Sequence, residues 1–239
     1  MIFPENVQFL STPRLIKNGA SNNNYKNFNL ANHVGDEPSA VLANRQLLVN
    51  HYNLPSEPKW LDQYHSNICV SIDSPDSSYL MKADSCITQT PGVVCAVLTA
   101  DCLPVFLCKK DGSAVGIVHA GWRGLLSGVI ESCMNAMDVN KGEILAHLGP
   151  AISQKAFEVG AEVRELFVDS HSGFENTFIQ HNNKYMMDLY AAARIVLNDY
   201  GVNSITGGEQ CTYSEQEKYY SYRRDGEKSG RMAHLIWML

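Results

Sequence analysis

The chain has 239 residues, of which 45% are hydrophobic and 18% charged, and its formal net charge is −6. This length allows a substantial core, and the negative charge argues against broad electrostatic attraction to nucleic acid or anionic membranes. No stretch approaches the roughly 20 apolar residues of a membrane span, and the first residues lack the basic and apolar regions of a secretory signal.

The first third of the chain combines an irregular start with one helix and several strands. Residues 1–35 are polar and irregular. A helix is predicted to begin near Asp36, a plausible cap, with Pro38 in its first turn, and to end before Leu54. A loop is predicted at 73–82. Strands are predicted at 60–65, 68–72, 83–88 and 93–99, the last of them buried. His65 therefore falls at a strand end or in a turn.

A hairpin signal follows, with the turn residues Lys109-Lys110-Asp111-Gly112 between two apolar runs at 105–108 and 114–119. A loop centred on 110 and 111 would place Cys102 directly opposite His119. A loop centred one residue later would make them diagonal neighbours, and both registers place them on one face. A three-residue loop would separate them. A thiolate and an imidazole at the open end of a hairpin suggest a metal site or a nucleophile with its base.

The remaining sequence alternates helices and strands. After the turn at 121–124, apolar residues at helical spacing predict a helix from Leu125 to Met137. Asp188 is predicted to cap a helix that Gly201 ends. The other predicted elements are strands at 143–148, 211–212, 219–222 and 232–238, helices at 161–168 and 189–200, and a turn at 223–226. This mixture predicts one α+β or layered α/β domain over residues 1–239.

The cysteine and histidine patterns restrict the chemistry. The seven cysteines are odd in number and form no Cys-x-x-Cys pair, which favours reduced thiols in a cytoplasmic protein. No two of the eight histidines lie within two positions of each other, which argues against multicopper oxidation. The zinc-deaminase signature, His-Glu-x-x-His, Gly-x-Ser-x-Gly and the P-loop are also absent.

Two arginine-containing segments could bind an anion. The glycine-flanked turn at 121–124 could present free N–H groups at a helix start, with Arg123 adding a charged fork. Alternatively, it is a tight strand-to-helix turn with Trp122 in the core. Arg223, Arg224 and Arg231 form the other arginine cluster, either a solvated hairpin tip or part of an anion site.

Six motifs in this order resemble the YfiH-like family over nearly the whole chain from about residue 28. The motifs are Trp60-Leu61-Asp62-Gln63-Tyr64-His65-Ser66, Thr99-Ala100-Asp101-Cys102-Leu103-Pro104, His119-Ala120-Gly121-Trp122-Arg123-Gly124, Leu148-Gly149-Pro150-Ala151-Ile152, Phe157-Glu158-Val159-Gly160, and Tyr220-Ser221-Tyr222-Arg223-Arg224-Asp225-Gly226 with Gly230-Arg231-Met232. The segment 11–21 departs from the family's Thr-Arg-x-Gly-Gly-Val-Ser pattern.

The resemblance implies a four-layer α/β/β/α sandwich and a zinc ion held by His65, Cys102 and His119. Three protein ligands with an open fourth position are typical of catalytic zinc. It also implies a purine nucleoside phosphorylase acting on adenosine, inosine and methylthioadenosine, with adenosine deaminase activity through zinc-activated water. Small-molecule nucleoside and phosphate are the expected partners. From charge alone, the phosphate candidates are Arg123, Arg223, Arg224 and Arg231.

Other functions fit the same residues. Without a metal, Cys102 activated by His119 would make a Cys-His hydrolase. A set of two histidines and one cysteine can also hold copper, and the family was long labelled a polyphenol oxidase or laccase. A protein that binds a cell-wall or nucleotide ligand without turnover is a third, non-catalytic class.

Overall fold

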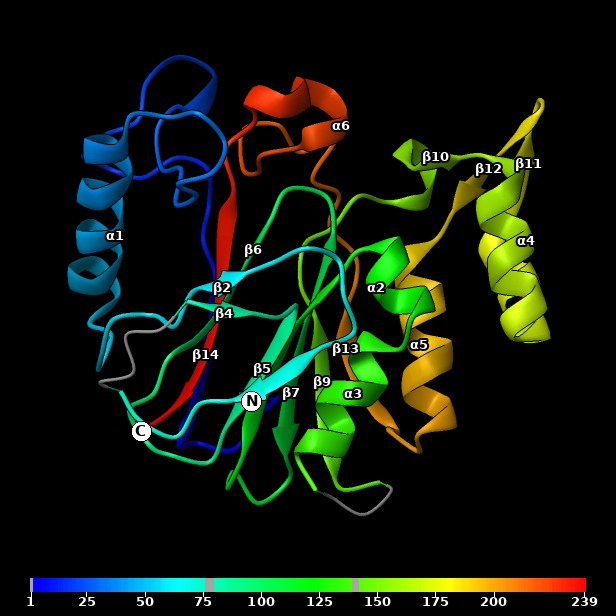
Figure 1. Ribbon diagram of the computed structural model, residues 1–239, viewed down its shortest axis with the longest axis horizontal. Helices are drawn as coiled ribbons and strands as arrows, with labels where there is room; N and C mark the ends of the chain where they lie inside the picture. Colours follow the sequence, from blue (N-terminus) through cyan, green and yellow to red (C-terminus); the bar gives the residue numbers. More distant parts are fainter. Residues whose placement is uncertain (1, 76–79, 139–141) are drawn as a thin grey trace.

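Two β-sheets pack face to face at the centre of the molecule, and helices cover both outer faces (Figure 1). The computed structural model describes residues 2–75, 80–138 and 142–239. The smaller sheet has the order β1-β14-β6 and the larger one β13-β9-β7-β8-β5-β3. The strands of the smaller sheet are β1 (Val7–Ser11), β14 (Met232–Met238) and β6 (Cys95–Thr99). Those of the larger sheet are β13 (Ser204–Gly207), β9 (Ile144–Leu148), β7 (Leu103–Lys109), β8 (Val115–Ala120), β5 (Ser85–Thr88) and β3 (Cys69–Ser71).

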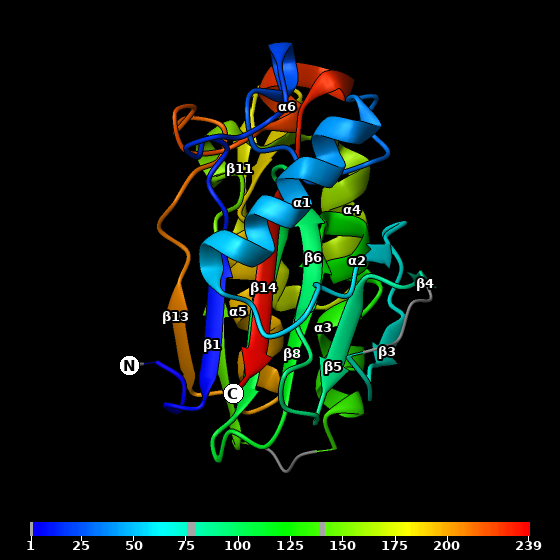
Figure 2. The same ribbon diagram turned by 90° about the vertical axis from the view of Figure 1, so that its left-hand side faces the viewer.

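The helices complete a four-layer arrangement. Helix α1 (Pro38–Tyr52) lies across the smaller sheet, as Figure 2 shows. The opposite face of the larger sheet is covered by a second group of helices. This group consists of α2 (Trp122–Leu126), α3 (Val129–Ala136) and α5 (Leu189–Asp199), with α4 (Ala161–Ser170) beside them. The predicted α+β class and the α/β/β/α layering are confirmed.

Period-two burial on the strands explains why these layers form. On β14, Leu235 and Trp237 face α1, whereas Ile236 and Met238 face the larger sheet. On β7, Leu107 packs beneath the helices and Phe106 packs between the sheets. Strands that are apolar on both faces can only be buried if a layer covers each face. The two central sheets therefore have apolar clusters on both sides.

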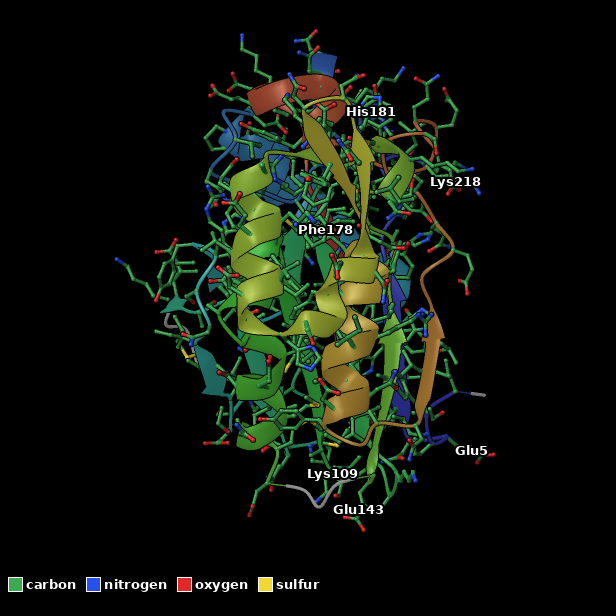
Figure 3. All side chains as sticks on the ribbon, turned by 90° about the vertical axis from the view of Figure 1, so that its right-hand side faces the viewer. Glu5, Lys109, Glu143, Phe178, His181 and Lys218 are labelled. Atoms are coloured by element: carbon green, nitrogen blue, oxygen red, sulfur yellow. The ribbon has the colours of Figure 1, made fainter. Side chains whose placement is uncertain are left out.

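Smaller elements lie at the edges of this sandwich. A three-stranded sheet, β10-β12-β11, lies beside α4, and Figure 3 shows its hairpin running from Phe178 to His181 at the tip. The short helix α6 (Tyr222–Asp225) lies at the end of the sheets where β14 begins (Figure 1). The remaining strands are β2 (Leu61–Asp62), β4 (Met81–Lys82), β10 (Glu158–Val159), β11 (Phe178–His181) and β12 (Lys184–Met187). Among the described residues, no helix has the length and apolar character needed to cross a bilayer.

The N-terminal third differs from the sequence-based prediction. The segment predicted as irregular contains β1, which pairs antiparallel with β14. Helix α1 begins at Pro38 with Glu37 at the cap position, because Asp36 instead accepts hydrogen bonds from Ser21 and Asn29. The predicted strand at 60–65 is reduced to β2. The predicted loop at 73–82 ends in β4, and its residues 76–79 lie outside the described part of the chain.

Two further predictions were wrong in the second half. The single helix predicted from Leu125 to Met137 is two helices, because Gly128 adopts a φ of +89° between α2 and α3. The predicted strand at 219–222 and turn at 223–226 are a loop and α6, which the Ser221 side chain caps by accepting from the Arg224 N–H. The predicted strand at 211–212 is an isolated bridge between Cys211 and Ala151. The helices at 161–168 and 189–200 and the final strand are confirmed.

The first and the last strand lie in one sheet, where β14 pairs with β1 on one side and with β6 on the other. We therefore propose that residues 1–239 form a single domain.

Candidate active site

The β7–β8 hairpin places Cys102 and His119 at one end of the larger sheet. Pro104 pairs with His119 across the two strands, and the Lys109 N–H donates to the Ala114 carbonyl. The loop is therefore centred on Asp111 and Gly112, the second of the two registers considered, and Gly112 has a φ of +70°. Cys102 lies two residues before the partner of His119, as a diagonal neighbour. In Figure 3, Lys109 lies at the end of the molecule opposite His181. Cys102 directly precedes the other end of β7, so the site lies far from the turn.

The space between the sheets changes from apolar to polar at this end. Val97 and Ile236 lie in the apolar cluster between the sheets. By strand alternation, Thr99 and His234 continue the same two rows on the same face. The His234 ring is fully buried, and its two nitrogens contact the hydroxyls of Ser11 at 2.7 Å and Thr99 at 2.8 Å. Burial lowers the pKa of His234 to about 3, so its imidazole is neutral.

A buried carboxylate holds both candidate histidines. The Asp84 side chain is fully buried and accepts from the ring Nδ1 of His119 at 2.8 Å. It also accepts from the backbone N–H groups of His65 at 3.0 Å and Ser66 at 2.6 Å, and from the Ser66 hydroxyl at 2.8 Å. Burial alone would raise the pKa of Asp84, but the hydrogen bonds from His119 and Ser66 outweigh it and hold the pKa well below its usual value.

These contacts orient the two imidazole rings. His65 has a φ of +64°, a conformation that its N–H bond to Asp84 helps to hold. Because Nδ1 of His119 faces Asp84, its Nε2 is the nitrogen left to face Cys102. The two rings have centroids 4.8 Å apart. This carboxylate–histidine contact is the kind that orients ligands in metal sites.

The three side chains converge on a common point. One potential ligand atom each from His65, Cys102 and His119 lies within 4.8 Å of the others, and the Cys102 sulfur is 3.8 Å from Nε2 of His65. Ligands of a tetrahedral zinc ion lie roughly 3.3–3.6 Å apart, from bond lengths of about 2.0–2.3 Å. A Cβ added at Gly121 would meet His65 Cδ2 at 2.8 Å and Cys102 Sγ at 3.0 Å. The donor set and this side-chain-free space therefore fit a metal ion.

The thiol and the imidazole also influence each other's ionisation. Burial opposes ionisation of Cys102, but the charges and hydrogen bonds of His119 and His65 outweigh it and lower the pKa of the thiol to about 6. Burial would likewise lower the pKa of His119, whereas Cys102 and Asp84 raise it to about 9. Without a metal, the site therefore favours a thiolate beside an imidazolium.

A cavity of about 470 Å³ opens at this cluster. Three arginines line it, and each packs against a cavity aromatic ring. Arg123 lies 4.2 Å from the Trp122 ring centroid, Arg223 lies 5.3 Å from that of Phe157, and Arg231 lies 5.7 Å from that of Tyr222. Such stacking holds a guanidinium in a fixed orientation. The cavity lining therefore includes cationic and aromatic side chains besides the thiol and the imidazoles.

Of the predicted cluster of Arg223, Arg224 and Arg231, only Arg223 and Arg231 line the cavity. Arg224 does not line it. Its guanidinium donates to the Thr212 and Tyr219 carbonyls and pairs with Asp225 at 2.8 Å. The turn at 121–124 leads directly into α2, and Trp122 is partly buried against the core as well as lining the cavity. The tight strand-to-helix turn with Trp122 against the core is thus observed, whereas anion binding at this turn stays a prediction.

Several residues important to the site were not predicted from the sequence. Asp84 was treated only as part of a strand, and no local pattern links it to His119, which is 35 positions away. Gln63 was noted only as part of a motif. Its amide makes two hydrogen bonds to the Leu98 backbone, at 3.0 and 2.8 Å, and so ties the His65 loop to β6. The small residues Ala120 and Gly121 directly after His119 are the local signal of open space beside the imidazole.

Comparison with known proteins identifies relatives that match nearly the whole chain. The family described as multi-copper polyphenol oxidoreductase laccase matches residues 10–239. A protein of Shigella flexneri named purine nucleoside phosphorylase YfiH is 46% identical over 237 residues, covering 99% of this chain and 96% of its own. A Pseudomonas aeruginosa protein named as a purine nucleoside phosphorylase is 41% identical, over 98% of this chain and 95% of its own.

Solved structures also match the fold over nearly the whole chain. A crystal structure of a Neisseria meningitidis protein is 42% identical and superposes with a TM-score of 0.93, covering 100% of this chain and 96% of its own. The YfiH protein of Bacillus licheniformis, described as hypothetical, is 26% identical with a TM-score of 0.90, covering 98% and 93%. The motifs, the fold and these relatives lead to one conclusion: the chain belongs to the YfiH-like family, whose description is multi-copper polyphenol oxidoreductase laccase.

Proposed function

We propose that this protein is a zinc-dependent purine nucleoside phosphorylase that also deaminates adenosine. The observation that carries the proposal is the cluster of His65, Cys102 and His119 in a cavity whose walls also present three arginines. Relatives at 41–46% identity that are named purine nucleoside phosphorylases support the reaction class. Adenosine, inosine and methylthioadenosine are the proposed substrates.

The candidate ligands are prepared for a metal by their surroundings. Nδ1 of His119 donates its hydrogen bond to Asp84, so Nε2 is the nitrogen that would bind a metal once its proton is displaced. The lowered pKa of Cys102 favours the thiolate that binds metals. A bound zinc ion would supply a water of lowered pKa for attack on the purine ring. Zinc is preferred to a multicopper centre because the described residues contain a single group of three or more possible ligands.

The cavity wall supports binding of nucleoside and phosphate together. Trp122, Phe157 and Tyr222 line the cavity and provide aromatic surface that a purine can contact. Arg123, Arg223 and Arg231 offer guanidinium groups that match a phosphate dianion. A volume of about 470 Å³ is within the range of small-molecule sites. We propose that these arginines hold the phosphate that attacks the ribose.

The test combines metal analysis with product analysis. Protein purified without added metal should contain about one zinc per chain, as a three-ligand site requires. It should release hypoxanthine from inosine in proportion to the phosphate consumed. Cys102→Ser keeps the shape of the thiol but replaces a strong zinc ligand, and His65→Ala removes a ring. Unchanged turnover of adenosine and inosine in both variants would exclude the zinc role.

A metal-free Cys-His hydrolase is the second candidate, because the pKa of Cys102 is lowered to about 6 beside His119. A free thiolate would react rapidly with iodoacetamide, whereas a zinc-bound thiolate would react slowly until a chelator is added. Rapid alkylation of protein without metal, together with loss of an amidase or thioesterase activity, would favour this candidate. A cytoplasmic location is proposed from the reduced cysteines, since all seven are free.

A further inference from the structure

Asp101 is a buried carboxylate that lies outside the candidate metal cluster. It directly precedes Cys102, is only 8% exposed, and has a φ of +92°. Residues other than glycine rarely adopt such backbone, although Asp and Asn tolerate it best. Aspartate suits this position because it tolerates the backbone conformation and its carboxylate can accept several hydrogen bonds.

The Asp101 carboxylate joins the end of β6 to the C-terminal segment of the chain. One oxygen accepts from the Thr212 hydroxyl at 2.6 Å. The other accepts from the Ser221 hydroxyl at 3.0 Å and from the backbone N–H of Arg223 at 2.7 Å. The Asp101 carbonyl accepts from the Ile152 N–H at 2.9 Å. Three segments, at Ile152, at Thr212 and at 221–223, are thus held around Asp101.

These contacts determine where Arg223 lies. Ser221 caps α6 by accepting from the Arg224 N–H at 3.2 Å, and Arg223 is the second residue of this four-residue helix. The Arg223 guanidinium donates to the Glu158 carbonyl at 3.0 Å and stacks on Phe157. Because α6 is too short to be rigid alone, its position depends on the Asp101 and Ser221 contacts.

We infer that Asp101 is a positioning residue that fixes Arg223 relative to Cys102, and so aligns the anion-binding wall of the cavity with the metal end. The choice of phosphate as the anion rests on the proposed function. The hydrogen bonds that hold α6 to Asp101 are independent of which anion the cavity binds. The predicted consequence is a selective defect in the use of phosphate.

The test compares two substitutions at Asp101. Asp101→Gly removes the carboxylate but permits a φ of +92°, so backbone strain does not obscure the result. Asp101→Asn can still accept from the Arg223 N–H through its oxygen while its NH₂ donates to the Thr212 oxygen. We expect the KM for phosphate to rise about tenfold in Asp101→Gly, the size expected for one lost charged hydrogen bond, with kcat within about threefold. Asp101→Asn should restore KM to within about threefold of wild type.

Two matched substitutions test the two carboxylate oxygens of Asp101 separately. Ser221→Ala removes a donor on the Arg223 side and should raise the phosphate KM in the same direction. Thr212→Val removes the donor to the other oxygen, which does not accept from Ser221 or Arg223, and should leave KM within about twofold. If Asp101→Gly fails to fold, the contrast between Ser221→Ala and Thr212→Val gives the same answer.

Backbone amide exchange provides a readout that does not require activity. Peptides covering residues 219–226 should exchange about tenfold faster in Asp101→Gly, whereas peptides from β6 and β14 should not change. Unchanged exchange at 219–226 would overturn the inference. So would a fall in kcat at constant phosphate KM, or equal defects in Thr212→Val and Ser221→Ala. A wild-type protein that does not consume phosphate would refute the proposed function, and the exchange data would still decide whether Asp101 holds α6.

Discussion

Gly121 leaves the space in which the candidate ligands meet, and replacing it with alanine tests that description directly. Its φ is −66°, so the backbone accepts alanine without strain. The added methyl group would lie 2.8 Å from His65 Cδ2 and 3.0 Å from Cys102 Sγ. Carbon atoms pack at about 3.5–4.0 Å, so one or both side chains must move by several tenths of an ångström.

We expect Gly121→Ala to lower metal affinity and turnover by about 10- to 100-fold, the range seen when metal ligands lose their orientation. The free energy of unfolding of the metal-free protein should fall by at most about 1 kcal/mol, because only the cap position of α2 changes. Metal content by elemental analysis, turnover of inosine and thermal unfolding with chelator measure the three quantities separately.

Gly92→Ala is the matched control. It adds the same methyl group where nothing lies within 4 Å, at a φ of +79°. It therefore reports backbone strain without touching the cavity, and should lose stability while keeping full metal content. Wild-type metal content and turnover in Gly121→Ala would refute the view that the ligands need this space.

Four further substitutions have distinct expected outcomes. Asp84→Asn should weaken metal binding by about 10- to 100-fold and destabilise the metal-free protein by about 2–3 kcal/mol, because an amide cannot accept all the hydrogen bonds of the carboxylate; unaltered unfolding in urea would contradict this. His234→Gln tests the buried neutral ring, whose pKa of about 3 lies below its unfolded value. The unfolded state therefore binds the extra proton, and wild-type stability should fall by about 1 kcal/mol from pH 7 to 5.5 through this group. The pH slope of the unfolding free energy should be shallower in the variant, and an identical slope would contradict the assignment. Arg224→Ala should lower the melting temperature and leave the phosphate KM unchanged, because its guanidinium holds the Thr212 and Tyr219 carbonyls and does not line the cavity. Arg231→Ala should lower the melting temperature and also raise the phosphate KM, because its guanidinium donates to the Ser229 and Gly230 carbonyls and lines the cavity; a raised KM in Arg224→Ala alone would reverse the roles given to these arginines.

Local features of the chain were predictable because they depend on neighbouring residues. The cap at Asp188 and the stop at Gly201 bound α5 as expected, since both act within one helical turn. The relation between Cys102 and His119 followed from an even-numbered hairpin loop and strand alternation. The zinc role proposed for His65 came from family resemblance, and no local pattern connected His65 to the hairpin.

The sequence by itself therefore determined the hairpin, the helices with clear caps and the final strand. Only the tertiary structure decided which distant residues complete the site. β1 forms a strand because β14 is available to pair with it, and α6 is a helix because Ser221 caps it beside Asp101. Asp84 links His65 to His119. Arg223 and Arg231 stack on aromatic rings and line the cavity, whereas Arg224 does not line it. These contacts join residues far apart in the chain, and the free energy that favours them comes from burial and hydrogen bonding that exist only after the layers have packed.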